Sequence, residues 1–218
     1  QYWKHFTDYV TRLSYILSQG IHQPDVALLY PLTTIHAHWP AGRMSEEGTR
    51  VKFNHPEDFD AAAHEAAKTS YVVAKRIYKS GIDLDFIDDR SLCSGEVGEG
   101  QLRLAGMAFR AVVLPQMTTI RTQTLEHIKA FYDSGGTVVA YHRLPDASPE
   151  QGRDDPNIQR LLRQIFGIAA SDAVTGLVQQ ENEHGGKGIF LPPDADASML
   201  PGFLSEAIDQ DVVASQED

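Results

Sequence analysis

The residues best suited to bind a ligand follow an apolar run near the start of the chain. The run 25–31 is typical of a buried parallel strand, and ligands of open parallel sheets bind beyond the carboxyl ends of the strands. The candidates there are two aromatic residues, two histidines and an arginine: Tyr30, His36, His38, Trp39 and Arg43. A His-x-His pair can ligate a metal, but no third metal ligand follows at a diagnostic spacing. An aromatic ring beside the histidines could instead stack on a sugar ring. We therefore expect no metal or cofactor, and favour a loop anchored by Trp39 on a neighbouring domain over a ligand-binding cleft rim.

Three aspartates, Asp85, Asp88 and Asp89, surround the end of a second short apolar run. Paired carboxylates perform acid–base chemistry in glycoside hydrolysis when they face each other across a cleft. Neighbouring side chains of one strand diverge instead, and aspartate favours helix caps and turns. We therefore expect these residues to cap a helix or to form a solvated rim.

Cys93 is the single cysteine of the chain, so it excludes an internal disulfide and leaves one candidate thiol nucleophile. A catalytic cysteine needs a setting that favours the thiolate, usually a sharp strand-to-helix elbow. Cys93 enters a glycine-rich stretch instead, and the strand that would carry an elbow in an amidotransferase-like fold ends in residues 115–116, Pro-Gln. The nearby Gly95, Gly98 and Gly100 lack the flanking strand, helix and lysine of a phosphate loop, which favours a hairpin-like turn.

The elements that position these residues alternate between strand and helix patterns. We expect strands at 25–31, 84–88, 111–115, 137–141 and 188–192, helices at 57–79, 120–134, 155–166 and 198–208, and a long irregular loop at 32–56. Strands that alternate with helices at this spacing imply right-handed crossovers and a parallel sheet. The sequence therefore predicts an α/β fold, a three-layer flavodoxin-like sandwich with a mainly parallel sheet.

A helix that ends near Gly20 precedes the first strand. Its apolar residues recur at 3.6-residue spacing on one face: Tyr2, Trp3, Phe6, Tyr9, Val10, Leu13, Ile16 and Leu17. Because the chain opens directly on this aromatic face, we expect it to pack against another part of a larger protein. The expected organisation is a connector at 1–22, a flavodoxin-like domain at 23–210 and a tail at 211–218.

Composition narrows the classes of function. The chain has 218 residues, of which 42% are hydrophobic and 9% aromatic, enough for one large domain with a core. Its formal net charge of −11 argues against nucleic acid or an anionic membrane as a partner, because phosphates would be repelled. No apolar run approaches the roughly 18 residues needed to span a bilayer.

An ordered set of segments resembles the region that follows the catalytic barrel of large bacterial α-L-rhamnosidases. The segments are 2–20, 25–31, 84–89, 100–106, 112–115 and 124–139. The same arrangement is similar to the domain after the barrel in family-42-type β-galactosidases, which is itself related to class I glutamine amidotransferases. The catalytic carboxylates of such enzymes lie on the (β/α)8 barrel, so the resemblance implies a non-catalytic accessory domain whose first helix is left over from that barrel.

The resemblance also implies partners and a location. The main partner is an upstream (β/α)8 catalytic domain of the same polypeptide. Contacts between copies in a homo-oligomer and contacts with carbohydrate are compatible with the resemblance. The implied location is the periplasm or the outside of a bacterial cell. Two alternatives stay open. One is a stand-alone module that binds a carbohydrate or another small molecule at the strand ends, and the other is an amidotransferase-like hydrolase that uses Cys93.

Overall fold

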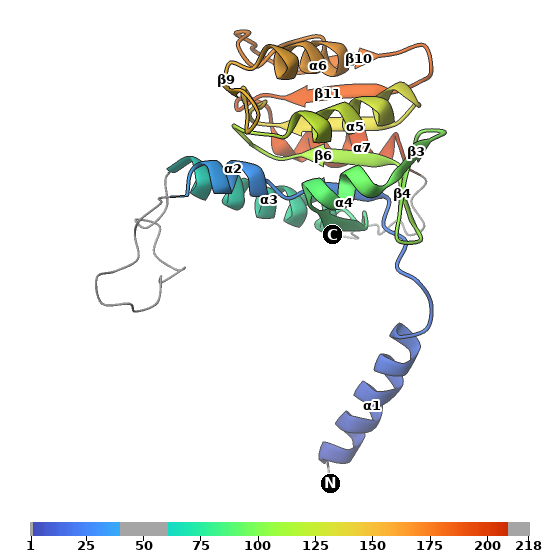
Figure 1. Ribbon diagram of the computed structural model, residues 1–218. Coiled ribbons are helices and arrows are strands. Elements are labelled where there is room, and N and C mark those ends of the chain that lie inside the picture. Colours follow the sequence, from blue (N-terminus) through green and yellow to red (C-terminus); the bar gives the residue numbers. More distant parts are fainter. Residues whose placement is uncertain (1, 40–60, 209–218) are drawn as a thin grey trace, which may run out of the picture.

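The computed structural model describes residues 2–39 and 61–208, and it shows a mixed α/β fold built on a six-stranded sheet (Figure 1). The strand order is β10-β11-β7-β6-β1-β2. The parallel strands are β1 (Val26–Leu29), β2 (Leu84–Ile87), β6 (Ala111–Leu114), β7 (Thr137–Tyr141) and β11 (Lys187–Leu191), and β10 (Val178–Glu181) runs antiparallel to β11. The mainly parallel sheet predicted from the sequence is thereby confirmed.

The central strands are buried on both faces. Every residue of β1, β6 and β7 is buried, and Val26 of β1 pairs with Leu84 on one side and with Ala111 on the other. A strand covered on both faces needs an uninterrupted apolar run rather than an alternating one. These runs therefore identified the strands in the sequence.

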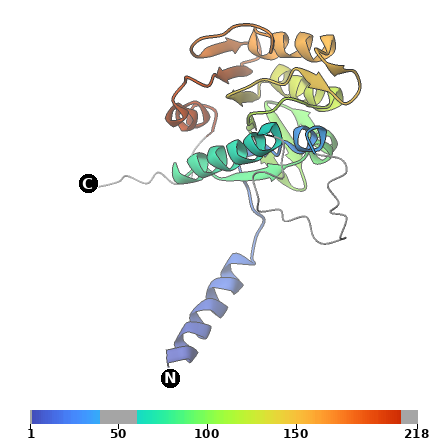
Figure 2. The same cartoon turned by 90° about the vertical axis from the view of Figure 1, so that its left-hand side faces the viewer.

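Helices cover both faces of the sheet (Figures 1 and 2). One core cluster receives apolar side chains from α4 (Asp89–Ser94), α5 (Thr122–Asp133) and α6 (Pro156–Phe166). The opposite cluster receives them from α3 (Ala61–Lys79) and α7 (Leu200–Ser205), the latter preceded by a 3-10 turn at Ala197–Met199. The two clusters lie on opposite faces, so the sheet is the middle of three layers.

The ends of α6 show how local chemistry sets the boundaries of an element. The Asp155 carboxylate accepts a hydrogen bond from the Asn157 backbone N–H at 2.8 Å, and Pro156 occupies the first turn. Gly167 ends the helix with a φ of 75°, in the left-handed region that glycine adopts without strain. The predicted helix start and stop are confirmed.

Two small antiparallel sheets accompany the main one. The first consists of β3 (Glu96–Gly98), β4 (Gln101–Leu104) and β5 (Met107–Phe109), and the turn between β3 and β4 has positive φ at both central residues, Glu99 and Gly100. That geometry is typical of a type I′ hairpin, which confirms the expected hairpin-like turn. The second, β8 (Ala147–Ser148) with β9 (Gly152–Arg153), has no predicted counterpart in the sequence.

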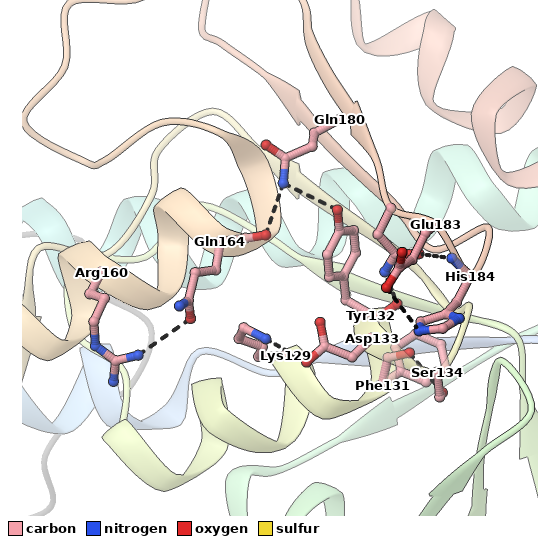
Figure 3. A network of polar contacts seen from close by, with 11 residues as sticks. Lys129, Phe131, Tyr132, Asp133, Ser134, Arg160, Gln164, Gln180, Glu183 and His184 are labelled. Atoms are coloured by element: carbon pink, nitrogen blue, oxygen red, sulfur yellow. Dashed lines mark hydrogen bonds and ion pairs between the residues drawn. The ribbon is translucent and has the colours of Figure 1, made fainter.

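The edge strand β10 is fastened to the helices by polar side chains (Figure 3). The Gln180 amide donates to the Tyr132 hydroxyl at 3.1 Å and to the Gln164 carbonyl at 2.9 Å. The Asn182 amide donates to the Tyr132 carbonyl at 2.8 Å. Strand β10 pairs with β11 but reads Val-Gln-Gln-Glu, so it has no apolar run that would predict a strand from the sequence.

Helix α1 (Tyr2–Leu17) lies apart from the sheet in both views (Figures 1 and 2). None of its residues is buried, and Trp3 and Phe6 on its apolar face are 75% and 57% exposed. The segment after it contacts the body through the Gln23 amide, which donates to the Gly106 carbonyl at 3.0 Å. None of the helices in the described ranges is both long enough and apolar enough to cross a bilayer.

Two local predictions were wrong. Residues expected to open an irregular loop form the short helix α2 (Leu32–Ala37), which packs beside α3 and spans too few residues to show a periodicity. Cys93 lies on α4 rather than in a glycine-rich loop, because Asp88 caps a helix before the first glycine. The expected helix start at residue 57, the rest of the loop and the tail at 211–218 lie outside the described residues.

Candidate functional site

A cavity of about 720 Å³ opens at the carboxyl ends of β1, β6 and β7, which are neighbours in the sheet. Each strand contributes the residues that follow it. The lining residues with side chains capable of polar contacts are Thr33, His36 and His38 after β1, Thr118, Thr119 and Arg121 after β6, and Arg143, Asp146, Ser148 and Arg153 after β7.

Hydrogen bonds through the buried Thr34 fix the relative positions of these loops. Its hydroxyl donates to the Thr119 carbonyl at 2.9 Å and accepts from the backbone N–H groups of Thr118 and Thr119 at 3.2 and 3.0 Å. The Thr118 carbonyl in turn accepts from the backbone N–H groups of Asp146 and Ala147 at 3.0 and 3.1 Å. These hydrogen bonds join the loops that follow β1, β6 and β7.

Three guanidinium groups border this cavity. Arg143 donates to the Asp146 carboxylate at 3.1 Å, whereas the side chains of Arg121 and Arg153 make no hydrogen bond or ion pair with the part of the chain that the structure describes. The Glu150 carboxylate is nearby, where it accepts from the backbone N–H and the hydroxyl of Thr122 at 3.3 and 3.4 Å. The lining carries more positive than negative charge in a chain whose net charge is −11.

A second cavity of about 500 Å³ lies beside the first, towards the end of β2. Asp89 organises its wall, since its carboxylate accepts from the hydroxyls of Thr33 and Thr124 at 2.6 and 2.8 Å. Asp88 caps α4 by accepting from the Ser91 backbone N–H at 2.6 Å, and this hydrogen bond lowers the pKa of Asp88. The expected capping role is confirmed for Asp88, while Asp89 joins the β1 loop to α5.

Cys93 lines the second cavity but lacks the setting of a nucleophile. Its Sγ lies 3.8 Å from the Thr124 hydroxyl, and no imidazole among residues 2–39 and 61–208 forms a hydrogen bond with it. Burial raises the pKa of the Cys93 thiol. A raised pKa leaves little thiolate at neutral pH, so this environment disfavours nucleophilic chemistry.

The structure brings two of the five predicted site residues into the cavity. His36 lines both cavities, and the Nε2 of His38 lies 2.9 Å from the Thr118 hydroxyl. The two histidines belong to α2 and its C-terminal cap rather than to a strand. No group of three metal-ligating side chains occurs in the described residues.

The other predicted residues lie elsewhere. Tyr30 packs edge-on against Tyr71 and Phe86, with ring centroids 6.5 and 5.9 Å away, and burial followed by the proximity of Tyr71 raises its pKa. Trp39 is 39% exposed and lines neither cavity. Arg43 lies outside the described residues.

Sequence reasoning missed the arginines that give the larger cavity its charge. The residues singled out in the sequence follow the first two strands. The rule that ligands bind at the carboxyl ends of strands also covers the loops after residues 111–115 and 137–141, which contain Arg121 and Arg143. Arg153 lies on β9, whose pairing with β8 carried no sequence signal.

Comparisons with known proteins bear on the fold. The sequence matches no protein-family model and no curated protein. Among solved structures, a catalytic mutant of Gan42B, a GH42 β-galactosidase from G. stearothermophilus, superposes with a TM-score of 0.57 at 13% identity, and another structure of Gan42B gives 0.54 at 12%. The cold-adapted β-galactosidase from Rahnella sp. R3 gives 0.50 at 12%.

These matches cover most of this chain but a minor part of each enzyme. They span 84–85% of the chain and 29–30% of the β-galactosidase chains. At such low identity the likeness establishes a shared fold, that of a part of GH42 enzymes. The fold likeness supports the resemblance to glycoside hydrolases. It does not support the resemblance to α-L-rhamnosidases in particular.

Proposed function

We propose that the chain is a non-catalytic accessory domain of a glycoside hydrolase, attached downstream of a (β/α)8 catalytic barrel. The observation that carries this proposal is the fold likeness, which takes in most of the chain and less than a third of each GH42 β-galactosidase. The ordered sequence segments that resemble the region after the barrel support the same conclusion. Substrate turnover then belongs to a part of the polypeptide beyond these 218 residues.

The strand order supports the finer, flavodoxin-like assignment. Numbered among themselves, the parallel strands β1, β2, β6, β7 and β11 follow the order 2-1-3-4-5, which is that of flavodoxin-like sheets. The end of β6, where an amidotransferase-like fold would hold its nucleophile, reads Pro115 and Gln116. We infer an amidotransferase-related scaffold that performs no cysteine chemistry.

Helix α1 is the proposed link to the barrel. Its aromatic face is exposed along its whole length, in contrast to the covered helices of the body. A surface of this kind gains stability when apolar area is removed from water, at about 25 cal/mol per Å². In this proposal the barrel covers that face, and other exposed surfaces are free for contacts between copies.

The proposal is tested by assaying the purified chain with an aryl β-galactoside and an aryl α-L-rhamnoside. The first substrate follows the structural neighbours and the second follows the sequence resemblance. We expect no saturable hydrolysis of either, with an authentic β-galactosidase and α-L-rhamnosidase as positive controls. Saturable turnover by the chain would show that it is an enzyme in its own right, and its loss in Cys93→Ala would favour the cysteine hydrolase.

The coding sequence upstream of Gln1 provides a second, independent test. An open reading frame that encodes several hundred further residues with eight βα repeats is the expected result. A start codon directly before Gln1 would contradict the proposed linkage.

A further inference from the structure

We propose that the cavity at the ends of β1, β6 and β7 binds a small polar molecule through a phosphate or carboxylate group, held by Arg121 and Arg153. This inference goes beyond the accessory role and does not depend on it. It rests on where the cavity lies, on the charges that face it and on its size.

The cavity lies at the topological switch point of the sheet. The chain passes from β1 to β2 on one side and later returns to place β6 on the other side of β1. The connections leave these strands in opposite directions, which opens a crevice beyond their carboxyl ends, and open α/β sheets bind ligands there. Residues that follow β1 and β6 line the cavity together, among them His36 and Arg121.

The charge of the lining indicates an anion. The side chains of Arg121 and Arg153 are exposed and make no hydrogen bond or ion pair within the described ranges, although the chain carries 30 acidic residues against 19 basic ones. A guanidinium group presents several N–H donors in a planar fork that matches carboxylate and phosphate oxygens. Asp146 bonds to Arg143, and Glu150 is held at the start of α5. Arg121 also faces the second cavity, which Asp88 and Asp89 line, but its guanidinium group forms no ion pair with them, so Arg121 and Arg153 remain to receive the ligand.

The size and the remaining lining indicate a small molecule. A volume of about 720 Å³ lies within the range of small-molecule sites, roughly 300–1,000 Å³. The hydroxyls of Thr33, Thr118 and Ser148 already bond to the protein, so the free polar contacts come from the arginines and His36, with apolar wall from Ala37 and Pro149. The net charge of −11 disfavours a polyanion, which leaves a ligand with one anionic group.

Isothermal titration calorimetry on the full chain at low salt tests the proposal with three probes. These are a hexose monophosphate, a hexuronate and the corresponding neutral hexose. We expect at least one of the two anions to bind with a Kd of about 1 mM or tighter, the neutral hexose to bind at least tenfold more weakly, and added NaCl to weaken the anion. Comparison of the phosphate and the carboxylate identifies the preferred group.

Matched arginine substitutions locate the binding. Arg121→Gln and Arg153→Gln should each raise the Kd of the bound anion about tenfold, because each removes a charge-assisted contact. Arg160→Gln is the control, since Arg160 is exposed on α6, bonds to Gln164 and does not line the cavity. Circular dichroism confirms that each variant is folded.

Three results would overturn the proposal. They are no saturable heat with either anion up to about 10 mM, equal affinity for the neutral hexose, and an Arg160→Gln effect as large as that of Arg121→Gln. None of them bears on the accessory role, which depends on the turnover assay and the upstream coding sequence.

Discussion

Helices α1 and α6 have the same kind of amphipathic pattern but different surroundings. Helix α6 buries its apolar residues, among them Leu162, Ile165 and Phe166, against the sheet and α5. Helix α1 carries a wider and more aromatic face, yet buries none of it. The pattern thus predicts that the apolar face of a helix is buried, whereas the element that buries it depends on tertiary structure.

The two helices also differ in what stabilises them. Each large side chain that α6 buries contributes about 1.5–3 kcal/mol, and its ends are capped by Asp155 and Gly167. Helix α1 has an exposed ion pair between Lys4 and Asp8 at 3.3 Å, and such pairs contribute about 0.3–0.5 kcal/mol. An isolated helix of 16 residues is marginal in water, so α1 is the element that most needs a partner.

The largest effect is expected in the core of the body. Phe131 on α5 is 1% exposed, and its ring lies over Gly136, where an added Cβ would fall 2.3 Å from Cζ. Phe131→Ala removes this packing and leaves a cavity, so we expect the free energy of unfolding to fall by about 3–5 kcal/mol. Urea denaturation followed by circular dichroism measures the change, and a loss below about 1 kcal/mol would contradict the close packing of α5 on the sheet.

A smaller effect is expected at the cap of α4, on the rim of the second cavity. The Ser91 N–H lowers the pKa of Asp88 below its ordinary value of 3.8, so the carboxylate stabilises the fold above that value. The stabilisation is lost as the pH falls through the lowered pKa, where the folded state also takes up the proton. Asp88→Ala should therefore reduce the free energy of unfolding at pH 7 by about 0.5–1 kcal/mol, as expected for an exposed cap.

The pH dependence distinguishes this cap from a general effect of the substitution. The difference between Asp88→Ala and the unmodified chain should shrink as the pH is lowered from 5 towards 2, in urea titrations at each pH. Asp88→Asn is the matched variant, since asparagine caps helices without a titrating group. A difference that stays constant over this pH range would show that the carboxylate does not act through the cap.

The fold was largely predictable because its signals are local. Apolar runs gave the buried strands, and Asp155, Pro156 and Gly167 gave the bounds of α6. What was missed depends on tertiary contacts. Helix α2 is too short for a periodicity. Strand β10 is mostly polar, and neither its pairing with β11 nor the two hydrogen bonds of Gln180 follow from a sequence pattern.

The position of the larger cavity was predictable, but its lining residues were predictable only in part. The carboxyl-end rule, which follows from sheet topology, selected His36 and His38, and both line that cavity. Arg121 and Arg153 are 32 residues apart in sequence and meet at one cavity through the pairing of β6 with β7 and the short β8–β9 ladder. Single-sequence reasoning has no access to such a juxtaposition.

The smallest change in the free energy of unfolding is expected for a substitution on the aromatic face of α1. This substitution tests the difference between the exposed α1 and the buried helices of the body most directly. Phe6→Ala removes the same ring as Phe131→Ala, but from a side chain that is 57% exposed and separate from the sheet. The free energy of unfolding of the body should change by less than about 0.5 kcal/mol. Urea denaturation of the two variants side by side gives the contrast, and a loss of 2 kcal/mol or more for Phe6→Ala would show that α1 packs on the body in solution. In a longer polypeptide that includes the proposed barrel, the same substitution should become destabilising, by an amount that approaches the cost at a buried position, because the face would then be covered.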